Sequence, residues 1–164
     1  TLLILKHRLK ATESCPTIQV VRDYQDLPWV ECYPGQLNQV FMNILANAID
    51  ALQGQREQTQ GFGETGVDKS PQIVIKTHSS DPEWVDIEIV DNGPGIPDDV
   101  QKRIFEPFFT TKDVGKGTGL GMSISCRIIT EIHRGQLKCI SEVNQGTTFT
   151  IRLPVSQGLT EKEG

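Results

Sequence analysis

One stretch of the chain constrains the fold more than any other, a regular stripe of apolar side chains across residues 37–52. Its members recur three or four positions apart: Leu37, Val40, Phe41, Ile44, Leu45, Ala48 and Leu52. This spacing places them on one face of an α-helix, and such a face has to be buried. Pro34 suits the first turn, where its missing N–H is not needed. The sequence therefore predicts a long amphipathic helix with one core face.

The opposite face of this helix carries Asn43, Asn47 and Asp50, at spacings of four and three residues. Residues spaced in this way lie in one row along a helix. Carboxamide and carboxylate oxygens suit a hard cation such as Mg²⁺, which prefers a few protein oxygens together with water and phosphate. Taken alone, a solvated helix face is the simpler explanation of this row.

The remaining periodic segments predict several strands and two further helices. The predicted strands are Ile18–Val21, Leu27–Cys32, Ile73–Thr77, Trp84–Val90, Gln136–Ser141 and Thr147–Leu153. The last four should form two antiparallel hairpins. A short helix is expected in Thr1–Lys10, and another from about Gly119 to His133, closed by Gly135. Many strands with few helices indicate an α+β fold, a two-layer α/β sandwich with helices on one face of a mixed, mostly antiparallel sheet.

Length and composition set further limits. The 164 residues suit one domain, expected over residues 1–156, with a tail at 157–164. Residues 54–72 are rich in Gly, Gln, Thr and Glu, and are expected to form a flexible insertion loop. The net charge of -5 argues against nucleic acid as a partner, since no basic face is available for a phosphate backbone.

The sequence also bears on the cellular compartment. The four cysteines, Cys15, Cys32, Cys126 and Cys139, form no C-x-x-C pair, which favours reduced thiols in a cytosolic protein. No apolar run approaches the ~20 residues that span a bilayer. A cytoplasmic domain is expected. Since the chain begins in the middle of a pattern, it reads as a fragment of a parent protein that is either soluble or membrane-attached.

A turn rich in glycine and proline, residues 91–97, follows a predicted strand directly. Gly93 and Gly95 would let the backbone approach a ligand closely, next to Ile96. Asp91, at the end of the strand, could accept a hydrogen bond from the amino group of adenine, whereas the O6 acceptor of guanine would meet a carboxylate with no proton to give. An ordinary turn is the competing explanation.

Three phenylalanines precede Lys112 in a predicted loop that reads Phe105-Glu-Pro-Phe-Phe-Thr-Thr-Lys112. Loops rarely hold so much apolar surface, so these rings could anchor a mobile lid. Lys112, which follows Phe109, Thr110 and Thr111, could then reach a terminal phosphate. A local hydrophobic cluster with an exposed lysine would give the same pattern.

A second glycine-rich segment runs directly into the predicted helix near residue 119 and contains Gly117, Thr118, Gly119, Leu120 and Gly121. Free N–H groups and the positive dipole end at such a helix start suit phosphate oxygens. No Walker motif is present, and alone this segment is a weak signal. Near the C-terminus, Thr148 adds a hydroxyl on the expected adenine side.

Together and in this order, the four motifs resemble the catalytic domain of sensor histidine kinases, in the GHKL superfamily. They match its N, G1, F and G2 boxes, and residues 146–148 resemble its G3 element. The likeness covers about Thr17 to Pro154. The Thr-Thr-Lys ending of the phenylalanine segment resembles the nitrogen-regulation subtype.

This resemblance implies a Bergerat fold that binds ATP and Mg²⁺ under a lid formed by residues 92–120. Asn47 would coordinate Mg²⁺, and Asp91 would contact adenine with help from Thr148. The other residues implied in ATP binding are Asn43, Asp50, Gly93, Gly95, Ile96, Phe109, Thr110, Thr111, Lys112, Gly117, Thr118, Gly119, Leu120 and Gly121. Catalysis would rest on Asn43 and Lys112.

Position 43 also separates relatives that share this fold. ATPases of the DNA gyrase type carry a water-activating glutamate there, whereas the amide of Asn43 cannot act as a general base. The resemblance therefore implies transfer of the γ-phosphoryl group to a histidine rather than efficient hydrolysis. None of the three histidines, His7, His78 and His133, precedes an acidic residue as family acceptors do.

The acceptor is accordingly expected in a dimerisation domain of the same protein outside this chain, with a response regulator as the further partner. The chain alone is expected to be monomeric. Two alternatives stay open. One is another enzyme of the same fold, either an ATPase, which Asn43 disfavours, or an anti-sigma serine kinase, which the phenylalanine segment disfavours. The other is a module that has lost catalysis, and a loss of Mg²⁺-dependent nucleotide binding would favour it.

Overall fold

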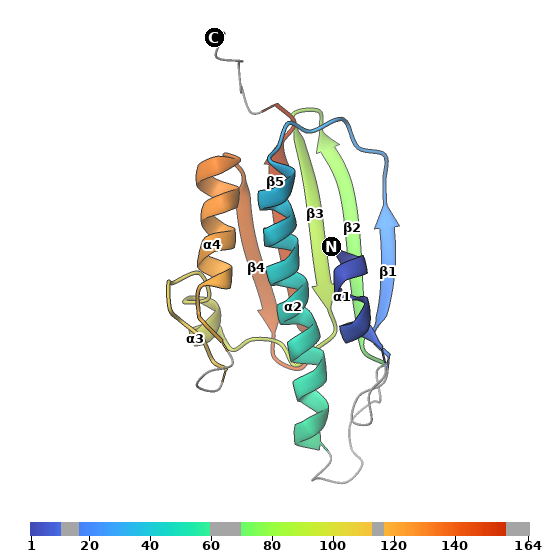
Figure 1. Cartoon of the computed structure of the whole chain (residues 1–164), viewed down its shortest axis with the longest axis vertical. Coiled ribbons are helices and arrows are strands. Elements are labelled where there is room, and N and C mark those ends of the chain that lie inside the picture. The colour runs from blue at the N-terminus through green and yellow to red at the C-terminus, as the bar shows by residue number, and fades with distance from the viewer. Residues whose placement is uncertain (11–16, 60–69, 113–116, 157–164) are drawn as a thin grey trace.

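A five-stranded sheet forms one layer of the domain, and helices cover one of its faces (Figure 1). The computed structural model describes residues 1–10, 17–59, 70–112 and 117–156. Along the sheet the order is β1 (Gln19–Tyr24), β2 (Gln72–Asp81), β3 (Trp84–Asp91), β5 (Gly146–Pro154) and β4 (Gln136–Glu142). β1 pairs with β2 in parallel, and the other neighbours are antiparallel. The predicted α+β sandwich and both hairpins are confirmed.

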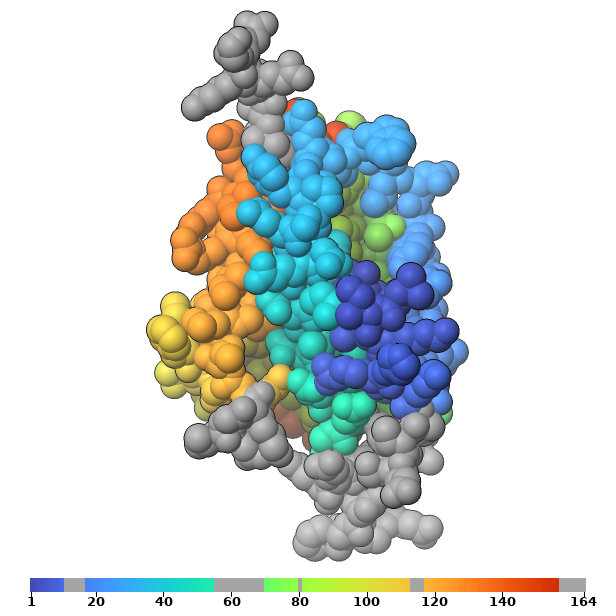
Figure 2. All heavy atoms as spheres, viewed as in Figure 1, coloured from blue at the N-terminus to red at the C-terminus, as the bar shows by residue number. Residues whose placement is uncertain are grey.

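The helical layer is built around the predicted amphipathic helix. It contains α1 (Leu2–Leu9), α2 (Pro34–Thr59), the single turn α3 (Asp98–Gln101) and α4 (Gly121–Arg127), which continues as the π-helical turn η1 (Ile128–Ile132). Figure 2 shows α2 along the middle of this face, flanked by α4 on one side and α1 on the other.

The core lies between α2 and the sheet. Val40 and Ile44 of α2 are completely buried, as are Ile73 of β2 and Ile151 of β5. Because side chains alternate between the two faces of a strand, the odd-numbered residues of β5 join this core while the even-numbered ones face away. The stripe that predicted α2 is therefore the stripe that holds the two layers together.

The face of the sheet turned away from the helices carries charged side chains. Asp86 of β3 is 6% exposed there, and its carboxylate lies 3.8 Å from Nε2 of His78 and 3.9 Å from Nε of Arg152. Arg152 also lies over the ring of Trp84, 5.2 Å from its centroid. Polar contacts of this kind allow one face of an antiparallel sheet to meet solvent.

One predicted strand does not form, and α2 ends later than predicted. Leu27–Cys32 is not a strand: the N–H of Glu31 donates to the carbonyl of Val155 at 2.9 Å, but no ladder forms around it, and Trp29 is 98% exposed. α2 does not end near residue 52 but continues to Thr59, through Gln, Arg and Glu residues that favour helix.

The second predicted helix differs at both ends. It begins at Gly121 rather than Gly119, and its last turn is a π-turn that ends before His133. Arg134, with φ 51°, adopts the left-handed conformation expected of Gly135. Gly135 is required for another reason, since a Cβ there would lie 2.3 Å from the carbonyl oxygen of Arg152.

Some predictions fall outside the described residues: the centre of the insertion loop (60–69), part of the lid (113–116), the C-terminal tail (157–164) and Cys15. Within the described ranges, no helix is both long enough and apolar enough to span a membrane. Cys32, Cys126 and Cys139 are free thiols.

Candidate nucleotide site

The polar face of α2 meets the start of α4 through the side chain of Asn43. Its Nδ2 donates to the carbonyl of Gly121 and to Oγ of Ser125, each at 3.0 Å. Ser125 is completely buried, and its own hydroxyl donates to the Gly121 carbonyl at 2.8 Å. Because both contacts use the amide nitrogen, the orientation of the carboxamide is fixed and Oδ1 is left as its acceptor.

One turn further along α2, Asn47 and Asp50 share a cation from the end of the phenylalanine segment. Nζ of Lys112 lies 3.1 Å from Oδ1 of Asn47 and 2.6 Å from Oδ2 of Asp50. The other carboxylate oxygen of Asp50 accepts a hydrogen bond from the Arg8 guanidinium of α1. The structure therefore brings together the predicted residues Asn47, Asp50 and Lys112 and adds Arg8, which the sequence did not suggest.

At the end of β3, Asp91 is 4% exposed and faces the helical layer. Its Oδ1 accepts a hydrogen bond from the N–H of Gly93 at 2.9 Å. Burial raises the pKa of this carboxyl from 3.8 to about 6, against the smaller opposing effect of hydrogen bonds from the backbone of Gly93 and Thr147. A buried carboxylate with spare acceptor capacity suits a ligand that donates a hydrogen bond.

The turn after Asp91 is held by the β4–β5 hairpin. The N–H of Ile96 donates to Oγ of Ser141 at 2.8 Å, and the N–H of Asn144 donates to the Pro94 carbonyl at 2.7 Å. Gly95 has φ 72°, and a Cβ there would lie 2.1 Å from the Glu142 carbonyl oxygen. Glycine is thus required by backbone conformation and by close approach.

Gly93 directly borders the carboxylate of Asp91. A Cβ at Gly93 would lie 2.7 Å from Oδ1 of Asp91 and 3.7 Å from Cβ of Ala51 on α2. The Asp91 turn and the polar helix therefore meet at one end of the helical layer, towards which β3 and α2 both run (Figure 1).

The second glycine-rich segment packs against the residues before Lys112. A Cβ at Gly117 would lie 2.7 Å from Oγ1 of Thr110, and one at Gly121 would lie 3.5 Å from the amide carbon of Asn43. Thr118 makes a hydrogen bond within the segment, since its Oγ1 accepts from the N–H of Leu120 at 3.3 Å. The segment predicted to hold phosphates thus faces the polar side of α2.

Only some of the phenylalanines in the phenylalanine segment contact other parts of the domain as the sequence suggested. Phe105 packs against the core and so anchors the segment. Phe109 stacks under Arg103, whose guanidinium carbon is 4.3 Å from the ring centroid. Phe108 is 76% exposed, with φ 64°, and Thr111 is exposed as well.

These contacts join an Asn-bearing helix, an Asp-Gly turn and a glycine-rich helix start in one place. A sequence profile described as histidine kinase-, DNA gyrase B- and HSP90-like ATPase matches residues 32–157, which include all three. The chain belongs to this ATPase family. Its similarity to solved proteins agrees: the catalytic domain of histidine kinase ThkA superposes with a TM-score of 0.73 at 25% identity, covering 95% of this chain and 88% of that one.

Two similar proteins are a sporulation kinase and a sensor kinase. The chain is 37% identical over 155 residues to sporulation kinase E of Bacillus subtilis (strain 168), covering 94% of this chain and 19% of the relative. It is 45% identical over 134 residues to sensor kinase CckA of Brucella abortus (strain 2308), covering 79% of this chain and 14% of the relative. The chain thus spans less than a fifth of the length of these two kinases.

One predicted site residue of this ATPase-family domain lies on the wrong face of its strand. Thr148 pairs with Val90 of β3, and its side chain points away from the face that carries Asp91. Thr147 is the residue opposite Asp91, is 6% exposed, and has its Oγ1 2.9 Å from Oγ of Ser141. The alternation of Phe149, Ile151 and Leu153 was the sequence signal for this face.

Ser125 and Arg8 were missed for a different reason. Each acts through another residue, Ser125 through Asn43 and Arg8 through Asp50, from positions 82 and 42 residues distant in the sequence. No local pattern marks such partners.

The oxygens of the site fit a metal ion that is also coordinated by groups other than the protein. Within the described ranges, no group of three or more His, Cys, Asp or Glu side chains could hold a metal alone. Asn47 and Asp50 nevertheless point two oxygens at one cation, the Lys112 ammonium. Mg²⁺ commonly binds through one or two protein oxygens together with phosphates and water, and this donor set is compatible with that arrangement.

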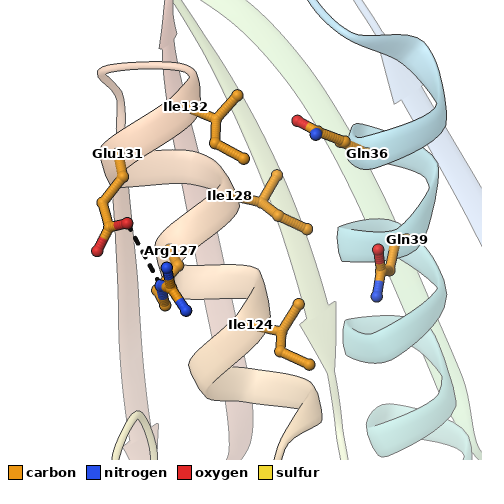
Figure 3. Close-up of a pocket in the computed structure, with 7 residues that line it drawn as sticks. All are labelled: Gln36, Gln39, Ile124, Arg127, Ile128, Glu131 and Ile132. Carbon is orange, nitrogen blue, oxygen red and sulfur yellow. Dashed lines mark hydrogen bonds and ion pairs between the residues drawn. The ribbon is translucent and has the colours of Figure 1, made fainter.

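A separate groove of about 310 Å³ lies between the start of α2 and the α4–η1 segment. Figure 3 shows Ile124, Ile128 and Ile132 on one side and Gln36 and Gln39 on the other. It includes none of the predicted ATP-binding residues. We therefore place the candidate nucleotide site at Asp91 and the polar face of α2.

Proposed function

We propose that this domain binds Mg-ATP and transfers the γ-phosphoryl group to a histidine of a dimerisation domain in the same protein, outside this chain. The convergence of Lys112, Asn47 and Asp50 carries this proposal, because it places a cation and two oxygen donors beside a glycine-rich helix start. A solved structure of similar fold, full-length ShkA, is a complex with AMPPNP, which supports nucleotide binding as the function of this domain.

In the proposed complex, the Asp91 carboxylate accepts a hydrogen bond from the adenine amine. Thr147 and Ser141 border that end of the site, and Gly93 and Gly95 shape its turn. This assignment predicts a preference for adenine over guanine, since O6 of guanine is an acceptor and would meet a second acceptor.

At the phosphate end, Asn47 is the proposed protein ligand of Mg²⁺, with Asp50 beside it. Mg²⁺ would neutralise charge on the phosphates as the γ-phosphoryl group leaves. Oδ1 of Asn43, the acceptor atom of that side chain, would lie beside the phosphates, while Lys112 and the backbone of residues 117–121 would face phosphate oxygens. The residues of this chain then act by positioning and by charge.

The absence of a carboxylate at position 43 supports phosphoryl transfer over hydrolysis. An amide cannot take a proton from water, and the amide nitrogen of Asn43 is already occupied by Gly121 and Ser125. Slow hydrolysis by the isolated domain is therefore expected, and rapid turnover of ATP would favour the gyrase-like alternative.

A response regulator is the proposed downstream partner. Histidine kinase ThkA, which shares this fold, has been solved in complex with response regulator TrrA. The Thr110-Thr111-Lys112 ending of the phenylalanine segment further supports the nitrogen-regulation subtype. Mixing the full-length parent kinase with candidate regulators and labelled ATP would test the pairing.

Calorimetric titration tests the nucleotide site directly. ADP and a non-hydrolysable ATP analogue should bind in a Mg²⁺-sensitive manner, and GDP should not. Asp91→Asn should weaken ADP binding at least about tenfold, since a buried acceptor is replaced by an amide that can also present a donor.

Asp86→Asn is the matched control. Asp86 is also a buried aspartate of β3, but five positions earlier and therefore on the opposite face of the sheet. Equal loss of binding in both variants, or binding of GDP as tight as that of ADP, would contradict the assigned adenine site.

A further inference from the structure

The ammonium of Lys112 occupies the position between Asn47 and Asp50 at which the proposed function requires a metal ion. Its Nζ is 3.1 Å from Oδ1 of Asn47, the oxygen assigned to Mg²⁺, and 2.6 Å from Oδ2 of Asp50. The lysine reaches these oxygens from 65 and 62 positions away in the sequence. This contact is therefore a tertiary feature of the site.

Two cations cannot share this position. A Mg²⁺ on the Asn47 oxygen with the ammonium still in place would put two positive charges a few ångströms apart, and such charges repel strongly near a protein surface. Lys112 must leave for the metal to enter. A phosphate group arriving with the metal would offer the displaced ammonium a new partner.

Asp50 is arranged to tolerate that departure. Its other oxygen accepts from the Arg8 guanidinium, so the carboxylate keeps a cationic partner when Lys112 moves away. Arg8 is itself held, since its backbone carbonyl accepts a hydrogen bond from Nε2 of Gln53 at 3.1 Å. The two cations on Asp50 thus differ: Arg8 belongs to the folded scaffold, and Lys112 to the segment before the glycine-rich loop.

We propose that Lys112 is a built-in substitute for the metal ion and is exchanged for it when Mg-nucleotide binds. This inference rests on the proposed function and adds regulation of the same site. Without ligand, the ammonium holds the Asn47 and Asp50 oxygens. Metal and nucleotide together release it, and the freed ammonium becomes available to a terminal phosphate. The exchange opposes metal binding in the absence of a γ-phosphate and favours it when one is present.

ADP and an ATP analogue should therefore respond in opposite ways to removal of the lysine charge. Calorimetry would compare the wild-type chain with Lys112→Met, with titrations in Mg²⁺ and in EDTA. For ADP with Mg²⁺, Lys112→Met should bind about two- to fivefold more tightly, the size expected for loss of a partly exposed ion pair. ADP in EDTA should bind equally to both, and the Mg²⁺-bound, non-hydrolysable ATP analogue should bind more weakly to the variant.

Two further variants control for charge and folding. Lys112→Arg keeps the cation, so it should not show the tighter binding of Mg-ADP expected of Lys112→Met. Lys102→Met removes an exposed lysine at the end of α3 and should change no affinity. Circular dichroism would verify that each variant is folded.

The outcomes separate this inference from the function on which it rests. Adenine-selective binding by the wild type, with the ratio of Mg²⁺ to EDTA affinities for ADP unchanged or lowered in Lys112→Met, would overturn the exchange and leave the function intact. Failure of the wild type to bind any adenine nucleotide would overturn both.

Discussion

Asp91 combines burial with hydrogen bonds from the backbone, and their balance decides at which pH the carboxyl is charged. Removal from water raises its pKa to about 6, because the hydrogen bonds from Gly93 and Thr147 offset only part of the desolvation. The charged form is the better acceptor for an adenine amine. At the scale of this residue, nucleotide affinity should therefore depend on pH in a range where an ordinary aspartate is fully ionised.

Titration of ADP between pH 5 and 8 should show this dependence. Above about pH 7 the carboxyl is ionised and the affinity should be constant. Below about pH 6 the ionised fraction of Asp91 falls about tenfold per pH unit, so the dissociation constant for ADP should rise by about the same factor. Asp91→Asn, with no proton to gain, should bind weakly with no such trend. A wild-type affinity that stays flat down to pH 5 would contradict the proposed role of the carboxylate.

At the scale of elements, Ser125 connects α4 to α2 by fixing the amide of Asn43. Ser125→Ala removes two buried hydrogen bonds, the one accepted from Asn43 and the one donated to the Gly121 carbonyl, and should lower the free energy of unfolding by about 1–3 kcal/mol. It should also weaken Mg-ADP binding, since the carboxamide of Asn43 is then less firmly oriented.

Ser123→Ala provides the comparison in the same helix. Ser123 is buried too, but its hydroxyl donates to the carbonyl of Leu120, three residues earlier, rather than to a group on α2. Denaturant unfolding and calorimetry on both variants would separate stability from binding. Equal effects of the two substitutions on ADP affinity would contradict a specific role of Ser125 in nucleotide binding.

His133 joins the end of the π-turn η1 to the start of α2. It is completely buried; its Nδ1 lies 2.8 Å from the Ile128 carbonyl oxygen, and its Nε2 accepts a hydrogen bond from the N–H of Tyr33 at 3.0 Å. These contacts assign the proton to Nδ1 and explain the ring as a structural bridge between two helical segments.

Replacing His133 should lower the stability of the fold strongly. His133→Ala leaves the partly buried N–H of Tyr33 without its acceptor, removes the side-chain hydrogen bond to the Ile128 carbonyl and opens a cavity, so the free energy of unfolding should fall by about 2–4 kcal/mol. His78→Ala, at a partly exposed site on the open face of the sheet, should change it by no more than about 0.5 kcal/mol. Urea unfolding of both variants measures the difference, and a loss below that of His78→Ala would refute the bridging role.

At the scale of the whole molecule, the placement of the histidines fits a domain that phosphorylates another segment. His133 is buried, and His78 lies on the face of the sheet opposite the proposed nucleotide site. The chain incubated with γ-labelled ATP should therefore incorporate no label. The full-length parent protein should become labelled on a histidine outside this chain.

Peptide mapping after the reaction checks this expectation, and label on His7, His78 or His133 would refute it. Sedimentation of the chain alone would measure its oligomeric state. A monomer is expected, because the dimerisation domain is proposed to lie outside the chain, and a stable dimer would contradict that expectation.

Local patterns in the sequence determined the elements of this protein and the positions of its motifs. The apolar stripe of α2 and the alternation in β2, β3, β4 and β5 predicted the two layers, because each periodicity permits one buried face. Asn47, Asp50 and Asp91 could be named in advance because their motifs lie on these elements or directly follow them, and Lys112 because it ends the phenylalanine segment.

Only the tertiary structure decided how these residues meet. The strand expected at Leu27–Cys32 does not form, since a strand needs a partner as well as a suitable composition. Thr147 replaced Thr148 because the register of β5 against β3 fixes which hydroxyl lies beside Asp91. The contacts of Arg8 and Lys112 with Asp50 join segments 42 and 62 positions apart. Such contacts depend on how the layers pack, and no local periodicity encodes them.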